Sequence, residues 1–183
     1  MSRQTLYTGR YVLPIISSLL EDGAVLVESG LIRAVGHYHD LAETHPEAAL
    51  FDFGESVLLP PMVNAHTHLE LTAFSDWAAA AGEPHAPQTF VDWILWLVRI
   101  RRDIGEEELK ASLEAGLKAS LFAGTGAVGD IFTTLNAVEA YLESLLYGQV
   151  FAEVLGHDLE LIEQRLSSIK SLTAQSPAKN LSW

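Results

Sequence analysis

Two histidines placed two residues apart carry the chemistry that this sequence suggests. They lie in the segment Leu-Pro-Pro-Met-Val-Asn-Ala-His-Thr-His-Leu-Glu-Leu, residues 59–71. Side chains alternate between the two faces of a β-strand, so His66 and His68 share one face with Asn64. Glu70 continues this polar row, and the opposite face is apolar except for Thr67. Two imidazoles about 7 Å apart along one face can bind the same metal ion.

The alternative is a pair of exposed histidines on an edge strand. The all-polar row needs an explanation if the opposite face packs on helices, and a polar pocket inside a barrel would supply it. The apolar lead-in with Pro60 and Pro61 strengthens the metal interpretation.

Three acidic residues are further candidates, each with a structural alternative. Asp130 ends an apolar run that begins at Gly126, where it could hydrogen-bond a metal-binding histidine or cap the next helix. Glu70 could contact substrate or make a structural hydrogen bond. Glu153 shares strand parity with His157, so both could face a barrel interior; a buried carboxylate there would need a partner.

The elements that position these residues fall into two groups. Residues 1–57 predict a small β domain, with a Ser-Gly hairpin signal between two of its strands. Strands and helices alternate from there on, which predicts a parallel α/β sheet or barrel. The expected strands are 5–12, 23–27, 31–35, 50–53, 57–71 with a break at the two prolines, 126–132 and 149–155, and 180–183 reads as the start of another. The expected helices are 89–102, 106–122, 135–146 and 159–173.

Composition excludes several classes of protein and of site. The chain has 183 residues, with 24 acidic and 11 basic side chains and a formal net charge of −13, so nucleic acid is not an expected partner. It has no cysteine, which excludes disulfides and thiolate metal ligands. No targeting or membrane segment is evident, so we expect no membrane association and a cytoplasmic protein.

Two segments resemble a known family. The run Val57-Leu-Leu-Pro-Pro-Met-Val-Asn-Ala-His-Thr-His68 resembles the first barrel strand of the metal-dependent amidohydrolase superfamily. Residues 23–36 resemble the small β domain that precedes that barrel. The similar branch is that of chlorohydrolases and of cytosine, guanine and adenosine-type deaminases. The resemblance implies an α/β fold: a small β-sandwich-like domain, incomplete, over 1–57, then about three βα units of a TIM (β/α)8 barrel over 58–183.

The resemblance also implies a function. His66 and His68 would be two ligands of one divalent metal, zinc in the first place and iron otherwise, whose bound water attacks a carbon that bears nitrogen or a halogen. The reaction would be hydrolysis of a non-peptide carbon–nitrogen bond, with deamination of a purine-like or nucleoside amine as the expected case. Guanine and a chlorinated triazine are competing substrates. The partner would be a small-molecule substrate.

The family's remaining ligands and proton-shuttling residues have no counterpart in this sequence. Three units stand where a barrel has eight, so we expect the N-terminal portion of an amidohydrolase, inactive alone, poorly soluble or forming a homo-oligomer. The alternative is a non-catalytic remnant or assembly module. The DNA that follows the codon for Trp183 would separate the two, since a later histidine and aspartate would favour the enzyme.

Overall fold

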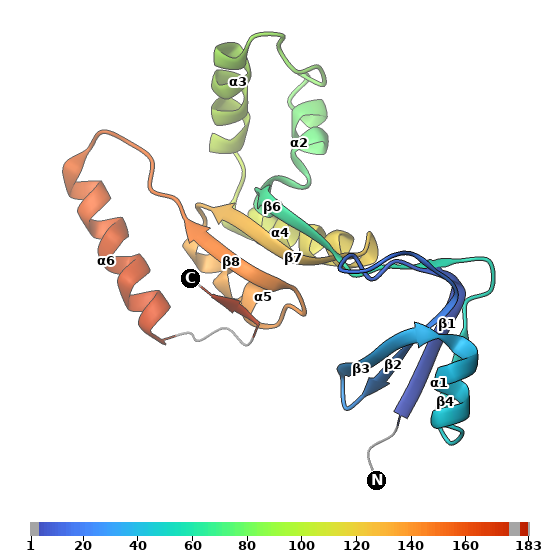
Figure 1. Ribbon diagram of the computed structural model, residues 1–183. Helices are drawn as coiled ribbons and strands as arrows, with labels where there is room; N and C mark the ends of the chain where they lie inside the picture. The colour runs from blue at the N-terminus through green and yellow to red at the C-terminus, as the bar shows by residue number, and fades with distance from the viewer. Residues whose placement is uncertain (1–3, 176–179, 183) are drawn as a thin grey trace. The chain divides into compact units, whose positions relative to one another are not determined.

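The computed structural model describes residues 4–175 and 180–182, and the chain forms two compact units, Met1–Pro60 and Pro61–Trp183 (Figure 1). The first unit is one mixed sheet with strand order β3-β2-β1-β4, and β5 also pairs with β1. Its elements are β1 (Gln4–Val12), β2 (Leu20–Glu28), β3 (Leu31–His37), α1 (Tyr38–Thr44), β4 (Ala49–Asp52) and β5 (Val57–Leu58). Strands β1 to β3 are antiparallel, whereas β4 and β5 run parallel to β1.

The predicted hairpin and an unpredicted helix shape this sheet. Ser29 and Gly30 both have positive φ, 54° and 76°, as a tight turn that follows the twist of its strands requires. Helix α1 supplies the second layer, in place of a second sheet, and packs against the buried side chains of Leu6, Ala24 and Leu26. Helix α1 was not predicted, because its seven residues show no long helical period.

The second unit is built on a parallel sheet. Strands β6 (Met62–Thr67), β7 (Thr125–Phe132), β8 (Tyr147–Ala152) and β9 (Leu181–Ser182) follow one another in this order, each parallel to the next. The expected strand–helix alternation and parallel sheet are therefore confirmed. Trp183, which the sequence analysis placed in the last strand, lies outside the described residues.

Helices connect these strands. They are η1 (Leu69–Leu71), α2 (Phe74–Ala80), α3 (Phe90–Arg102), α4 (Glu106–Phe122), η2 (Leu135–Ala137), α5 (Val138–Leu142) and α6 (Leu159–Gln175). Helix α3 begins as predicted, because the Thr89 hydroxyl accepts a hydrogen bond of 3.2 Å from the backbone N–H of Asp92. At the start of α4, the Glu108 carboxylate accepts one of 3.0 Å from the N–H of Gly105.

The core of the second unit lies between the sheet and two of its helices. Leu113 and Leu117 of α4 and Tyr141 of α5 are buried against Val128 of β7 and Val150 of β8. This burial fixes which face of β7 points to the helices. Along α4, Leu109, Leu113 and Leu117 are buried, whereas Leu121 is 38% exposed.

Some predicted boundaries were wrong. The predicted break at the two prolines, which lack N–H donors, is confirmed: β5 belongs to the first sheet and β6 to the second. The strand expected to reach Leu71 ends at Thr67, because residues 69–71 form η1. The helix expected over 135–146 ends at Leu142. On α3 the buried side chains are Trp96 and Ile100, and Phe90 is 74% exposed.

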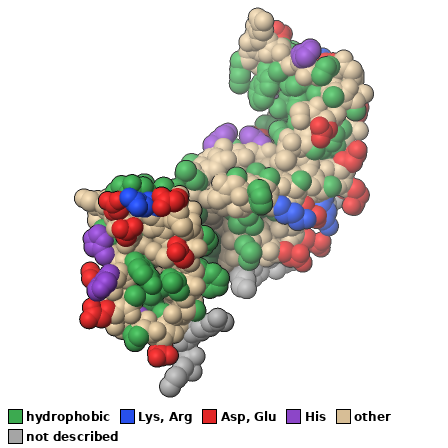
Figure 2. All heavy atoms as spheres, turned by 90° about the vertical axis from the view of Figure 1, so that its right-hand side faces the viewer, with side chains coloured by type: hydrophobic (Ala, Val, Ile, Leu, Met, Phe, Trp, Pro, Cys, Tyr) green, Lys and Arg blue, Asp and Glu red, His purple; other side chains and the backbone are tan. Residues whose placement is uncertain are grey.

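Large apolar side chains remain on the surface, as the green atoms in Figure 2 show. On helix α6, Leu159 and Leu166 are exposed, whereas Leu172 packs on the core of the second unit. In the described ranges, 4–175 and 180–182, no helix is long and apolar enough to cross a membrane.

Candidate metal centre

The two histidines lie at the carboxyl end of β6. His66 is exposed and still within the strand, and His68 is half-buried just after Thr67, the last residue of the strand. Their ring centroids are 5.4 Å apart and the rings are inclined by 76°. The carboxyl ends of parallel strands are where barrel enzymes gather their active sites. The structure therefore brings the predicted pair together at the expected edge.

The positions of the two imidazoles fit two of the ligands of a metal site. Nitrogen ligands about 2.0–2.1 Å from a tetrahedral ion would put two imidazole centroids about 5 Å apart, close to the observed separation. Across residues 4–175 and 180–182, no group of three or more His, Asp or Glu side chains is arranged to hold a metal. The donor set is therefore two imidazoles, short of the three or four protein ligands of known zinc sites.

Asp130 is a fully buried carboxylate beside this pair. One oxygen accepts a hydrogen bond of 2.9 Å from the backbone N–H of Leu69, and the other accepts one from the Tyr141 hydroxyl. Burial raises the pKa of the Asp130 carboxyl, while these two hydrogen bonds and the nearby His68 oppose the rise. Burial also raises the pKa of the Tyr141 phenol, so the tyrosine stays the donor. Asp130 lies within β7 and caps no helix.

Glu70 is also buried, with 2% of its surface exposed. Its carboxylate accepts hydrogen bonds of 3.1 Å from the backbone N–H groups of both Thr133 and Thr134, and one of 2.6 Å from the Thr133 hydroxyl. The guanidinium of Arg101 forms an ion pair with it at 3.3 Å. We call Glu70, Arg101, Thr133 and Thr134 the Glu70 clasp.

Glu153 and His157 do not share a strand, contrary to the prediction. Strand β8 ends at Ala152, and the N–H of Glu153 donates a bond of 2.8 Å to the carbonyl of Phe132. Glu153 is half-buried at the carboxyl end of β8, on the same edge of the sheet as the histidines, whereas His157 is exposed in the following loop. A predicted substrate contact of Glu153 stays a prediction.

Arg101, Tyr141 and the two threonines were missed by the sequence analysis. Thr133 and Thr134 directly follow a buried strand, which is the position where functional residues of barrels occur, so this signal was available. Arg101 gave no such signal, because it stands among three arginines that suit the end of any helix.

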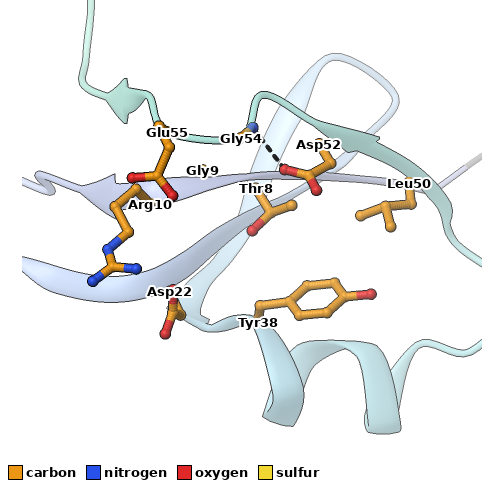
Figure 3. Close-up of a pocket in the computed structure, with 9 residues that line it drawn as sticks. All are labelled: Thr8, Gly9, Arg10, Asp22, Tyr38, Leu50, Asp52, Gly54 and Glu55. Carbon is orange, nitrogen blue, oxygen red and sulfur yellow. Dashed lines mark hydrogen bonds between the residues drawn. The ribbon is translucent and has the colours of Figure 1, made fainter.

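A separate cavity of about 310 Å³ lies in the first unit, lined by residues of β1, β4 and their surroundings (Figure 3). Asp52 lies on its wall and accepts a hydrogen bond of 2.8 Å from the N–H of Gly54. None of the predicted site residues lines this cavity, so it does not define the candidate site.

Comparison with known proteins identifies the relatives of both units. The Imidazolonepropionase-like composite domain of bacteria matches residues 23–48. The aminodeoxyfutalosine deaminase of Deinococcus radiodurans is 31% identical over 151 residues, which are 82% of this chain. The crystal structure of Helicobacter pylori aminofutalosine deaminase in complex with methylthio-coformycin superposes with a TM-score of 0.79 at 28% identity, over 97% of this chain. The chain belongs to the amidohydrolase superfamily.

Within this superfamily the chain matches only part of each relative. It spans 32% of the Deinococcus enzyme and 42% of the Helicobacter one. A zinc-bound adenosine deaminase structure from Xanthomonas campestris shares the fold, with a TM-score of 0.64 at 21% identity over 98% of this chain and 42% of its own. These matches confirm that the parallel sheet is the N-terminal part of an amidohydrolase barrel.

Proposed function

We propose that this chain supplies the first metal-binding strand of a hydrolase that acts on non-peptide carbon–nitrogen bonds. The observation that carries the proposal is the imidazole pair at the carboxyl end of β6, 5.4 Å apart, in a chain related to aminodeoxyfutalosine and aminofutalosine deaminases. The preferred substrate class is a purine-like or nucleoside amine. Residues 1–57 would be an incomplete composite domain and residues 58–183 the first barrel units.

Each residue has a defined part in this proposal. His66 and His68 would hold one divalent metal, zinc before iron, which would supply an activated water at neutral pH. Asp130 holds the backbone N–H of Leu69 and so fixes the chain directly after His68. Glu153 faces the same edge and remains our candidate for substrate contact. The hydrogen bonds of Glu70 favour a positioning role over the substrate contact predicted for it.

A chimera tests the function. This chain would replace the segment that it matches in the Deinococcus enzyme. Ammonia release would be measured with aminodeoxyfutalosine, adenosine and guanine, and chloride release with a chlorinated triazine. We expect ammonia from a purine-like nucleoside, and none after His66→Ala or His68→Ala. A folded chimera that releases neither ammonia nor chloride would favour the non-catalytic assembly module. A cytoplasmic location and a homo-oligomer stay predictions.

A further inference from the structure

The Glu70 clasp joins three segments that are far apart in the sequence. Glu70 belongs to the turn after β6, Thr133 and Thr134 follow β7, and Arg101 lies in the last turn of α3. One nitrogen of the Arg101 guanidinium donates to Glu70 at 3.3 Å, to the Thr134 hydroxyl at 3.1 Å and to the Thr133 hydroxyl. Both oxygens of the buried Glu70 carboxylate accept hydrogen bonds from the protein. One accepts from Arg101 and the Thr133 hydroxyl, and the other from the backbone N–H groups of Thr133 and Thr134.

The clasp acts on the residues that directly follow a predicted metal ligand. After His68, the N–H of Leu69 is held by Asp130 and the side chain of Glu70 is held by the clasp. His66 lies earlier, within β6, and its N–H donates a hydrogen bond of 3.3 Å to the Asn64 side chain. Fixing the backbone on one side of His68 limits the orientations of its imidazole.

We propose that Arg101 is a positioning residue: acting through Glu70, it sets the orientation of His68 at the end of β6. The inference rests on the proposed function for its metal-binding consequence, but the orientation of His68 can be measured without metal. It also gives α3 a structural role, because this helix places the Arg101 guanidinium at the carboxyl edge of the sheet.

Arg101→Gln tests the proposal, and Arg99→Gln is its matched control. Both arginines lie on α3, but Arg99 pairs with Glu83 at the surface, where the two side chains are 57% and 40% exposed. Arg101→Lys keeps the charge without the planar fork, and Thr133→Val removes one hydroxyl while leaving the backbone bonds of the clasp in place.

Two measurements are made on the full chain. The first records the imidazole NMR signals of His66 and His68 without metal, and the second follows a titration with zinc ions through the same signals. We expect Arg101→Gln to shift and broaden the His68 signal more than the His66 signal and to weaken zinc binding about 10-fold. Arg101→Lys should restore part of both effects, and Arg99→Gln should change neither.

The results separate the inference from the proposed function. Equal responses to Arg101→Gln and Arg99→Gln, or a His68 signal unchanged by both, would overturn the positioning role. If Arg101→Gln does not fold, Thr133→Val decides in its place: a selective change at His68 supports the role and an unchanged His68 refutes it. If zinc perturbs neither histidine of the unmodified chain, the two imidazoles alone do not bind zinc and the chimera decides the metal proposal, while the metal-free spectra still decide the role of Arg101.

Discussion

Buried Asp130 stands beside the histidine pair with a pKa raised by burial. A carboxyl whose pKa is higher in the folded than in the unfolded state favours folding when it is protonated, below about pH 3.9. That contribution is lost as the pH rises through the folded pKa. We therefore expect the stability of the unmodified chain, relative to Asp130→Asn, to fall as the pH is raised from 4 to 7.

Urea unfolding followed by tryptophan fluorescence measures this difference. All four tryptophans lie after Pro60, so the signal reports the second unit. Asp130→Asn also alters the hydrogen bonds of this side chain. The part of that change in stability that does not depend on pH leaves the pH dependence of the difference between the two proteins unaffected. A difference that is flat, or that rises with pH, would show that the carboxylate is better stabilised than its burial implies.

Gly129 allows β7 to approach the histidine strand closely. A Cβ added there would lie 2.5 Å from the carbonyl oxygen of Ala65, which precedes His66. We expect Gly129→Ala to destabilise the second unit by about 1–3 kcal/mol, because backbone must move. In Gly36→Ala the new Cβ meets atoms no closer than 3.8 Å in the first unit, so the tryptophan-reported transition should not change. Equal midpoints for both variants would contradict this reading of the strand contact.

At the scale of elements, α4 packs on the sheet through Leu113 and Leu117 and not through Leu121 near its C-terminal end. Leu113 is 0% exposed whereas Leu121, further along the same helix, is 38% exposed. Leu113→Ala should therefore cost about 2–5 kcal/mol of unfolding free energy, and Leu121→Ala less than about 1 kcal/mol. Urea midpoints of the two variants check this. Similar losses would mean that the outer end of α4 is packed as well.

The sequence predicted elements well where the signal is local. The helices expected over 89–102 and 106–122 depend on signals within a few residues, and both were confirmed. The end of β8 was misplaced because Val154 and Leu155 suit a strand although pairing stops at Ala152. The contact between Arg101 and Glu70, 31 residues apart, depends on how α3 folds back to the sheet, and no spacing rule indicates it. The histidine pair was predictable because its spacing and its strand are both local.

At the scale of the whole molecule, exposed apolar surface dominates the expected behaviour. Met62 and Val63 on β6 are 61% and 71% exposed, and β6 is an edge of the sheet in the described part of the chain. Unpaired edges and apolar patches favour association. We expect the chain to form oligomers whose mass rises with concentration in sedimentation velocity. A monodisperse monomer that unfolds cooperatively would contradict this expectation.

The central claim is that His66 and His68 hold one metal ion, and the metal content of the chimera tests it most directly. We expect about one equivalent of zinc or iron per chimera by elemental mass spectrometry, lost in both His66→Ala and His68→Ala. The exposed His157→Ala variant is the matched control and should keep the metal. A chimera that retains its metal in both alanine variants, or that never binds one, would contradict the account.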